Sequence, residues 1–320
     1  MTKPCWTPDR VWAIVLAGGE GERVRSLVRR WLGRHRAKQY CTFAGTRSMF
    51  QHTVDRALKL APPERIVTVI ARGHREDALA QLDGRAVRKV LLQPENRDTA
   101  AGIFLPLAHI RAQDPDATVV IFPSDHFVHP EDRFLEIVQR AATAAEWLAD
   151  RLVLVAVRPD RPEHEYGWVE PGRELVSSAG PPVRAVRRFL EKPDEARAIE
   201  AMAGGGLWNT LVLSAKVEGL WTLGWQCFPG MMSLFDQLVP AIGTRQESRT
   251  LDGIYTHMPV HNFSSGLLER VPERVAAIEL DGVLWCDWGK PERIADTLAM
   301  LGKQPAFPLE LLAASQAAGA

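Results

Sequence analysis

The segment Val11 to Gln39 reads VWAIVLAGGEGERVRSLVRRWLGRHRAKQ and joins an apolar run to a glycine-rich loop. The run Val11 to Leu16 has the composition of a buried strand. The glycines after it let the backbone turn tightly and approach a bound group without a Cβ in the way. Main-chain N–H groups in such a turn form a concave anion site, and Arg23 and Lys38 add positive charge. This combination predicts a binding site for a triphosphate.

Two common phosphate loops do not fit this segment. No Gly-Lys pair followed by Ser or Thr closes it, and its glycines do not follow the dinucleotide spacing G-x-G-x-x-G. A strand-to-helix turn whose glycines serve packing alone is the structural alternative. The candidate nucleotide-binding residues of the loop are Leu16, Ala17, Gly18, Gly19, Gly21, Glu22 and Arg23.

The composition limits the classes of function. A chain of 320 residues can bury a large core, and 46% apolar with 24% charged residues is ordinary for a globular protein. Lys+Arg and Asp+Glu both total 39, which argues against a nucleic-acid polymer as partner. A group of arginines after the loop would form either a basic wall for phosphates or a solvated helix face. This group comprises Arg29, Arg30, Arg34 and Arg36.

The cysteines and the apolar runs exclude further classes. Cys5, Cys41, Cys227 and Cys286 form no C-x-x-C pair, so neither a disulfide scaffold nor a zinc site is expected. No apolar run approaches the roughly 18 residues that span a bilayer. The basic start before Val11 resembles a signal peptide only faintly, because the apolar run is short. We expect a cytoplasmic protein without a membrane partner, and its oligomeric state stays open, with a homodimer as one option.

Strand-like and helix-like segments alternate through the first half. The expected strands are Val11 to Leu16, Ile66 to Ala71, Lys89 to Gln93, Thr118 to Pro123 and Leu152 to Val157. The expected helices are Met49 to Leu60, Thr99 to Gln113 and Glu131 to Ala149. Such alternation predicts an α/β fold with a Rossmann-like, mostly parallel sheet flanked by helices.

After residue 160 the elements become shorter and proline and glycine more frequent. We expect one domain over residues 1–305, with a nucleotide-binding part at about 11–160 and a substrate-binding part at about 161–301. Residues 306–320 form an Ala-rich tail. The expected strands here are Val183 to Glu191, Trp208 to Ser214, Val275 to Glu279 and Val283 to Trp285. The expected helices are Asp194 to Ala203 and Lys290 to Leu301.

A carboxylate ends one of the expected strands, in the sequence VVIFPSDH of residues 119–126. Ligands bind at the carboxyl ends of strands in open parallel sheets, so Asp125 should lie at the same edge as the glycine-rich loop. A carboxylate beside a phosphate site is suited to hold Mg²⁺. Capping of the next helix by Ser124 or Asp125 is the structural alternative.

Several motifs together resemble the sugar-1-phosphate nucleotidyltransferases. Leu16 to Arg23 matches the family pattern L-A-G-G-x-G-x-R, and Ala37 to Gln39 stands in place of P-K-Q. The residues 123–126 are similar to P-A-D-H. The resemblance covers about Val11 to Leu301 and implies a fold of the nucleotide-diphospho-sugar transferase (GT-A-like) type.

A second metal-binding aspartate is implied by the sequence CDWGKP of residues 286–291. Asp287 and Gly289 match the family patterns D-x-G-S-W and D-x-G-T-P, but Lys290 replaces the usual small hydroxyl residue. Lys290 could pair with Asp287 and compete with a metal, or it could contact a substrate phosphate. Helix capping by Asp287, with Pro291 in the first turn, is again the structural alternative.

The resemblance also implies a sugar-phosphate site. Phe189 to Pro193 matches F-x-E-K-P, and Glu165 to Val169 resembles G-Y-G-Y-I, with Glu165 in place of the first glycine. The adjacent Trp208 and Asn209 match the family's W-N. The sugar-phosphate residues that the resemblance implies are Gly167, Glu191, Lys192 and Asn209.

The mannose-1-phosphate guanylyltransferase branch is indicated by Gln93 to Ala100, which resembles E-P-x-x-R-N-T-A with Asp98 replacing the usual Asn. At Asn262 to Glu269 the family carries S-I-D-Y-A-V-M-E, but Ser265 stands where an Asp is common. We expect only a capped helix there. Further nucleotide contacts are expected from Gln93, Arg97, Thr99 and Ser124.

The resemblance implies transfer of a nucleotide from a nucleoside triphosphate, GTP by this branch, to a sugar 1-phosphate. The products would be an NDP-sugar, GDP-mannose by this branch, and pyrophosphate. Glucose 1-phosphate remains a competing substrate. Arg23, Lys38 and Asp125 are the expected catalytic residues, and Asp125 and Asp287 are the expected ligands of Mg²⁺.

Two other classes stay open. A non-catalytic regulatory paralogue that binds a nucleotide-sugar would account for the unusual Asp98, Ser265 and Lys290. An NAD-dependent Rossmann dehydrogenase fits less well, because the third glycine is missing and Arg72, not an acid, follows the second strand.

Overall fold

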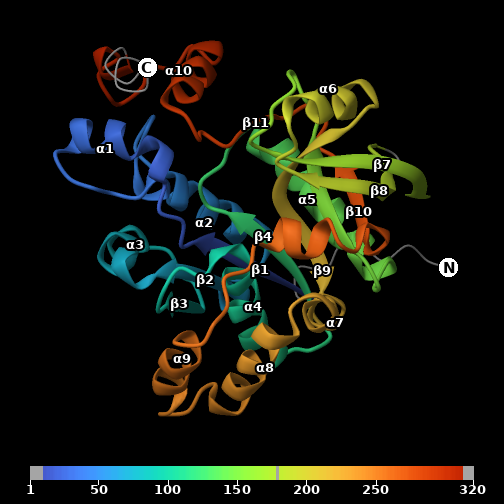
Figure 1. The fold of residues 1–320 in the computed structure, drawn as a ribbon. Coiled ribbons are helices and arrows are strands. Elements are labelled where there is room, and N and C mark those ends of the chain that lie inside the picture. Colours follow the sequence, from blue (N-terminus) through green and yellow to red (C-terminus); the bar gives the residue numbers. More distant parts are fainter. Residues whose placement is uncertain (1–9, 178–179, 313–320) are drawn as a thin grey trace.

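The computed structural model describes residues 10–177 and 180–312, which places Cys5 and residues 313–320 of the tail outside the described residues. Its centre is a nine-stranded sheet of order β3-β2-β1-β4-β9-β6-β10-β8-β7 (Figure 1). The strands are β1 Val11–Ala17, β2 Ile66–Ala71, β3 Lys89–Gln93, β4 Thr118–Pro123, β5 Phe127–His129, β6 Leu152–Val157, β7 Gly167–Val176, β8 Val183–Glu191, β9 Leu207–Lys216, β10 Val275–Glu279 and β11 Leu284–Cys286.

Helices pack on both faces of this sheet (Figure 1). Among the described residues, none of them is long and apolar enough to cross a bilayer. The α-helices are α1 Arg25–Leu32, α2 Met49–Leu60, α3 Arg75–Gln81, α4 Asp98–Arg111, α5 Glu131–Trp147, α6 Glu195–Ala203, α7 Val217–Cys227, α8 Pro229–Leu238, α9 Glu247–Tyr255 and α10 Pro291–Met300.

Alternate residues of the central strands enter two separate cores. In β1, Ile14 belongs to the core formed with α4, α7 and α8, whereas Val15 belongs to the core formed with α2 and α5. Both side chains are fully buried. Burial on both faces explains why β1 has a continuous apolar sequence without polar alternation.

The sheet is parallel in one half and mainly antiparallel in the other. Strand β1 pairs in parallel with β2 and β4, and β2 pairs in parallel with β3. Strand β9 then runs antiparallel between β4 and β6. The α/β fold class is confirmed, but "mostly parallel" describes only the half of the sheet formed by β3, β2, β1 and β4. The antiparallel insertion of β9 depends on contacts between distant segments, which no local pattern marks.

A two-stranded sheet brings the two candidate metal-binding aspartates to one place. Strands β5 and β11 pair antiparallel, with Cys286 opposite Phe127. Asp125 precedes β5 closely in the chain, and Asp287 directly follows β11. The antiparallel pairing therefore delivers both carboxylates to the same end of this small sheet.

The C-terminal segment packs against the helix that follows the glycine-rich loop. Val28 of α1, Ile294 of α10 and Phe307 share a third apolar cluster. Phe307 is only 2% exposed, so the expected tail begins as a packed part of the fold. Figure 1 shows α10 beside α1. This cluster anchors α1 to α10 and to the C-terminal segment.

Candidate active site

The glycine-rich loop, residues 18–21, is held by hydrogen bonds from the segment that carries Lys38. Nε2 of Gln39 donates to the carbonyl oxygens of Ala17 and Gly19, at 3.0 and 2.8 Å. Gly21 has a positive φ of 64°. A Cβ added there would lie 2.8 Å from the main-chain nitrogen of Lys38. Glycine is therefore required at this position for two reasons, and the close approach puts Lys38 beside the loop as predicted.

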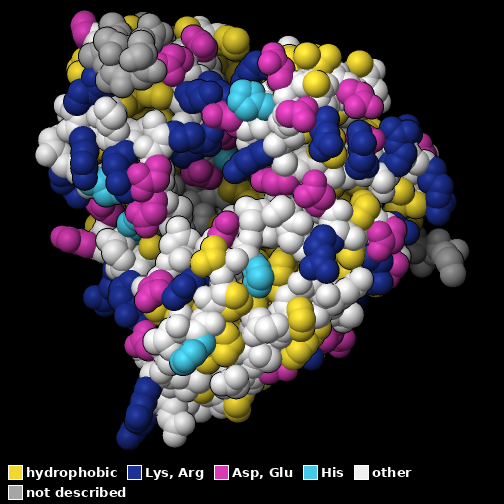
Figure 2. Space-filling model, viewed as in Figure 1, with side chains coloured by type: hydrophobic (Ala, Val, Ile, Leu, Met, Phe, Trp, Pro, Cys, Tyr) yellow, Lys and Arg dark blue, Asp and Glu magenta, His cyan; other side chains and the backbone are white. Residues whose placement is uncertain are grey.

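A cavity of about 460 Å³ opens next to this loop. Its volume is in the range of sites that hold small ligands. Basic and acidic side chains gather around the hollow near the middle of the face in Figure 2. The predicted nucleotide-binding residues among those that line the cavity are Leu16, Gly18, Gly19, Gln93 and Thr99.

Two other residues predicted to contact the nucleotide, Arg97 and Ser124, form hydrogen bonds within the protein. Nη2 of Arg97 donates to the carbonyl oxygen of Tyr255 at 3.0 Å, which ties it to the end of α9. Ser124 is 1% exposed, and its main-chain nitrogen donates to the carbonyl oxygen of Leu16 at 3.0 Å. Ser124 therefore joins the ends of β4 and β1, and its hydroxyl has no partner among the described residues.

Lys38 connects the two aspartates. It is 4% exposed, and its Nζ lies 2.9 Å from Oδ2 of Asp125. The same ammonium donates to the main-chain oxygen of Asp287. Burial raises the pKa of Asp125, but the charges of Lys38 and His126 outweigh it and hold this pKa below its usual range. Asp125 is therefore a carboxylate at neutral pH.

Asp287 is surrounded by donors. Its Oδ1 accepts from the Tyr166 hydroxyl at 2.6 Å, from the main-chain nitrogen of Gly289 at 3.0 Å and from Arg293 at 3.0 Å. Its Oδ2 pairs with Nη2 of Arg23 at 3.0 Å. Burial raises the pKa of Asp287, but the charge of Lys38 and these hydrogen bonds lower it far more strongly.

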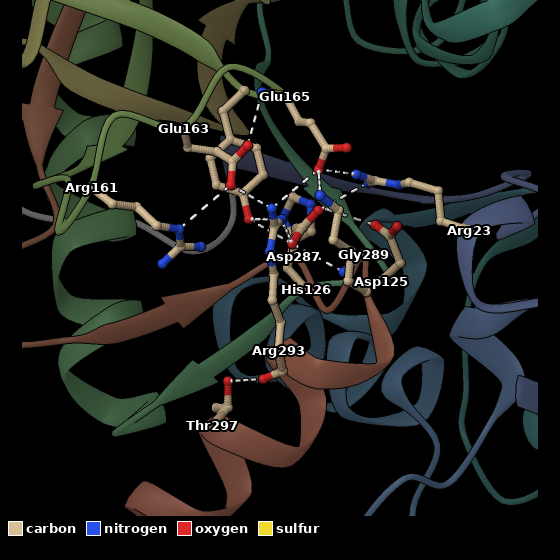
Figure 3. Close-up of polar contacts among 12 residues, drawn as sticks. Arg23, Asp125, His126, Arg161, Glu163, Glu165, Asp287, Gly289, Arg293 and Thr297 are labelled. Atoms are coloured by element: carbon tan, nitrogen blue, oxygen red, sulfur yellow. Dashed lines mark hydrogen bonds and ion pairs between the residues drawn. The ribbon is translucent and has the colours of Figure 1, made fainter. Parts of the chain in front are cut away.

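Glu165 is the second acid, besides Asp287, that contacts Arg23. Its Oε2 lies 3.2 Å from Arg23, 3.1 Å from Lys290 and 3.1 Å from Arg293. Figure 3 shows Arg23 reaching from one side and Arg293 from the other toward Asp287 and Glu165. Of the two partners expected for Lys290, Asp287 is not the one it pairs with in the structure, because its partner is Glu165. Contact of Lys290 with a substrate phosphate stays a prediction.

The side chains fit a divalent cation only in part. The Asp125 side chain is 41% exposed and pairs with Lys38 through Oδ2, so it can offer an oxygen ligand. Asp287 is 8% exposed, and both its carboxylate oxygens are engaged. In the part of the chain that the structure describes, no group of three or more His, Cys, Asp or Glu residues is arranged to hold a metal. Asp125 thus fits a magnesium ligand, and Asp287 does not while Arg23 contacts it.

The predicted sugar-phosphate residues gather on strands β7, β8 and β9. Gly167 lies opposite Glu191 in the sheet, and a Cβ on Gly167 would lie 2.9 Å from the Glu191 carboxylate. Burial raises the pKa of Glu191, as do the nearby acids Glu269 and Asp98.

The other two predicted sugar-phosphate residues lie at or next to a residue with a positive φ. Lys192 directly follows Glu191 and has a positive φ of 46°. Oδ1 of Asn209 accepts from the main-chain nitrogen of Leu211 at 3.0 Å, and Leu211 also has a positive φ. This turn leaves the amide NH₂ of Asn209 as the group available to a ligand.

Two departures from the family pattern are joined through one residue. Nδ2 of Asn262 donates to Oδ1 of Asp98 at 3.3 Å, and Oδ1 of Asn262 accepts from the main-chain nitrogen of Ser265 at 3.1 Å. The expected capped helix here is a short π-helical turn, Ser264–Leu268. Asn262 caps this turn and also orients Asp98.

Three of the four arginines after the loop have partners within the fold. Arg34 and Arg36 pair with Asp77 of α3, at 3.1 and 3.0 Å, and Arg30 donates to the carbonyl oxygen of Leu311. These contacts attach α1 to the C-terminal segment and the residues after α1 to α3, so they serve the fold.

Two site residues were not identified from the sequence. Arg293 contacts Glu163, Glu165 and Asp287 and is 11% exposed, and its guanidinium lies 5.1 Å from the ring centre of Tyr166. The only sequence signal is that Arg293 stands in the first turn of the helix after Asp287. Tyr166 lies within a recognised motif, but its contact with Asp287 joins segments far apart in the chain.

Comparison with known proteins agrees with this arrangement. The nucleotidyl transferase family profile matches residues 12–303. The chain is 32% identical over 200 residues to the alginate biosynthesis protein AlgA of Pseudomonas aeruginosa, covering 62% of this chain and 40% of that one. It is 30% identical over 203 residues to a mannose-1-phosphate guanylyltransferase of Escherichia coli, covering 62% and 41%. The chain thus spans about two fifths of the length of these relatives.

A solved structure from Thermus thermophilus, described as a mannose-1-phosphate geranyltransferase, superposes with a TM-score of 0.74 at 26% identity. The match covers 89% of this chain and 79% of that one. The family profile extends over almost all the described residues and includes the loop, both aspartates and the strands of the second half. The chain therefore belongs to the nucleotidyl transferase family.

Proposed function

We propose that this protein transfers a nucleotide from a nucleoside triphosphate to a sugar 1-phosphate, giving an NDP-sugar and pyrophosphate. The observation that carries the proposal is that Asp287 joins Arg23, through its carboxylate, to Lys38, through its main-chain oxygen, and that Lys38 pairs with Asp125 and packs against Gly21 of the glycine-rich loop. The same loop lines a cavity of about 460 Å³. Two cations and a carboxylate at this edge of the sheet suit a triphosphate. Family membership supports the same reaction class.

The chemistry requires positioning more than proton transfer. A sugar phosphate is already an anion, so its oxygen can attack the α-phosphorus in line without a strong general base. The residues must hold the two anions together and neutralise charge in the transition state. We assign Arg23 to the leaving pyrophosphate and Lys38 to the α-phosphate, since Lys38 is buried at the loop.

A divalent metal, which this family generally uses, would be held by Asp125 and would supply positive charge to the phosphates. Asp287 would contribute only after Arg23 has left its Oδ2. Until then, Asp287 has a structural role. Its carboxylate accepts hydrogen bonds from Tyr166 and Arg293, and its main-chain oxygen accepts one from Lys38.

For the substrates, we propose GTP and mannose 1-phosphate, with GDP-mannose as product. The names of the relatives support this assignment, and glucose 1-phosphate remains the competitor. We place the nucleotide in the part before residue 160 and the sugar phosphate near Gly167, Glu191, Lys192 and Asn209. One catalytic domain over residues 1–305, a cytoplasmic location and a homodimer are also proposals.

A pyrophosphate-release assay tests the proposed function. The four common nucleoside triphosphates are each combined with mannose 1-phosphate or glucose 1-phosphate, with Mg²⁺ and again with EDTA. We expect the highest rate for GTP with mannose 1-phosphate, and no release without a sugar phosphate. Absence of pyrophosphate from all combinations would contradict the proposal.

A non-catalytic, nucleotide-sugar-binding paralogue is the second candidate. The pairing of Arg23 with Asp287 and Glu165 favours it, because both of the acids that hold Arg23 compete with a triphosphate. Under this alternative, calorimetry detects binding of GDP-mannose while the assay detects no pyrophosphate.

A further inference from the structure

Two residues that depart from the family pattern contact each other. Nζ of Lys290 lies 3.1 Å from Oε2 of Glu165, although the residues belong to separate loops, before α10 and before β7. The family resemblance implies a small hydroxyl residue and a glycine at these positions, and neither carries charge. An ion pair therefore replaces two neutral residues at the edge of the candidate active site.

The same carboxylate oxygen of Glu165 lies 3.2 Å from Arg23, which closely follows the glycine-rich loop. Arg23 also pairs with Asp287 and keeps 49% of its side chain exposed. Figure 3 shows the Arg23 guanidinium directed toward both acids, with which it forms ion pairs. The cation that the proposed function assigns to pyrophosphate is thus held by two carboxylates in the free protein.

We propose that Glu165 is an exchangeable counter-ion for Arg23, and that Lys290 neutralises Glu165 when Arg23 moves to the triphosphate. The inference rests on the proposed function, since it takes a triphosphate as the competing anion. Both residues are positioning residues, because they act through Arg23 and do not contact the reacting atoms.

Lys290 is the cation suited to this task. Arg293 also lies 3.1 Å from Glu165, but its guanidinium forms ion pairs with Glu163 and Asp287 as well. Lys290 contacts no other acid in the described residues, and its side chain is 44% exposed. Its charge therefore remains available to Glu165 after Arg23 has left, which lowers the cost of the exchange.

The exchange has a second consequence at Asp287. Its Oδ2 has Arg23 as partner, so departure of Arg23 exposes this oxygen while Oδ1 stays bound to Tyr166 and Arg293. Triphosphate binding and the availability of Asp287 to a cation become linked through one arginine.

A double-mutant cycle in the full chain tests the inference. Binding of GTP is measured by calorimetry for the parent, Glu165→Gln, Lys290→Ser and the double variant, with EDTA and again with Mg²⁺. Partly exposed ion pairs are weak, so we expect changes of about threefold in Kd. Glu165→Gln should tighten GTP binding, Lys290→Ser should weaken it, and Lys290→Ser should have no effect once Glu165 is Gln.

A matched control is Glu146→Gln, which removes a carboxylate of similar exposure, 29%, paired with Lys216 on another part of the fold. GTP affinity and KM values should not change there. In the cycle variants the KM for GTP should shift while the KM for the sugar 1-phosphate stays constant, which a general loss of structure would not produce.

Two outcomes overturn the inference. If Lys290→Ser weakens GTP binding equally in both backgrounds, Lys290 contacts the triphosphate directly and needs no Glu165. If Glu165→Gln weakens binding or leaves it unchanged, Glu165 does not compete for Arg23. A parent that binds none of the four nucleoside triphosphates overturns the proposed function as well, whereas a binding parent with an additive cycle overturns the inference alone.

Discussion

Nζ of Lys38 lies 2.9 Å from Oδ2 of Asp125, and both groups stand at the carboxyl end of the parallel part of the sheet. The same ammonium donates to the main-chain oxygen of Asp287. One buried cation thus fixes the positions of two acidic residues that arrive from opposite strands of the β5–β11 sheet. The site is organised before any substrate binds.

This arrangement predicts that Asp125→Asn abolishes most turnover and leaves the fold intact. Asparagine keeps the size of the side chain and an oxygen for Lys38, but it removes the charge that would direct a divalent cation. Loss of one electrostatic group of this kind costs about 10²–10³-fold in rate. Pyrophosphate release at saturating substrates measures the effect, and circular dichroism verifies the fold.

A matched control is Asp132→Asn, which changes an aspartate that is 95% exposed at the start of α5. Its turnover should equal that of the parent. Near-normal Mg²⁺-dependent turnover of Asp125→Asn would show that Asp125 has no such role.

Much of the N-terminal fold could be predicted because its signals are local. The predicted helix Met49 to Leu60 is α2, whose start is fixed by a capping box between Ser48 and Gln51. The predicted strand Ile66 to Ala71 is β2 without change. Apolar runs and caps act within a few residues, so the sequence contains them directly.

The helices of the second half illustrate what could not be predicted. Helix α7 contains Gly219 and Gly224, which weaken helix propensity. A Cβ on Gly224 would lie 2.4 Å from the ring of Phe104 in α4. The glycine permits close packing of two helices, and that reason is visible only once the fold is known.

The same distinction holds at the site. The loop and Asp125 each follow one strand, so local sequence placed them, whereas the two partners of Arg23, Glu165 and Asp287, come from two segments that are distant from it in the chain. Glu165 and Lys290 were identified only as departures from a pattern, and Arg293 was not identified. Ion pairs between distant segments leave no periodic signal in a single sequence.

Gly21→Ala should impair both stability and nucleotide binding. A left-handed conformation costs a residue with a Cβ about 1–2 kcal/mol, and here the new Cβ would also lie 2.8 Å from the main-chain nitrogen of Lys38. The loop must therefore move away from Lys38. We expect a lower Tm and at least about tenfold weaker GTP binding, a loss of roughly 1.4 kcal/mol.

Gly33→Ala separates the effect of the left-handed backbone conformation from the effect of a Cβ that lies too close to a neighbouring residue. Gly33 has a φ of 69°, but a Cβ there would meet nothing within 4 Å. This variant should lose stability through the backbone conformation alone and keep its GTP affinity. Equal GTP affinities for the two variants would argue against close packing of Gly21 on Lys38 as a requirement for binding.

Asn209→Asp tests the sugar-phosphate site. Oδ1 of Asn209 accepts from the main-chain nitrogen of Leu211, and aspartate retains that acceptor. The substitution removes the amide donor and adds a charge close to an incoming phosphate. We expect a higher KM for the sugar 1-phosphate and weaker discrimination between epimers, because a lost polar partner reduces selectivity.

GTP affinity of Asn209→Asp, measured by calorimetry, should match that of the parent. Asn209→Ala is less suitable as a test, because it also releases the turn at Leu211, which has a positive φ. Loss of GTP affinity with unchanged sugar selectivity would mean that Asn209 belongs to the nucleotide part of the cleft.

Acid stability should depend on Glu131 at the start of α5. Its Oε1 lies 3.1 Å from Nε of the buried Arg56 and 3.4 Å from Nδ1 of His52. Burial raises the pKa of Glu131, but the close contact with His52 and the charge and hydrogen bond of Arg56 outweigh it and lower the pKa to about 2. A carboxyl whose pKa is lowered in the folded state stabilises the fold above its unfolded pKa and loses this effect as the pH falls toward the folded value.

Glu131→Gln should therefore reduce the free energy of unfolding at pH 7 by about 1–3 kcal/mol, the cost of leaving a buried polar partner unsatisfied. The difference from the parent should shrink as the pH falls below about 4.5 and vanish toward about 2, the unfolded and folded pKa values of Glu131. Urea unfolding at pH 7, 5, 4 and 3 measures it. Glu136→Gln on the same helix, whose carboxylate is 54% exposed beside Arg133, should have little effect at any pH. A destabilisation by Glu131→Gln that stays constant from pH 7 to pH 3 would show that the charge of Glu131 is not its source.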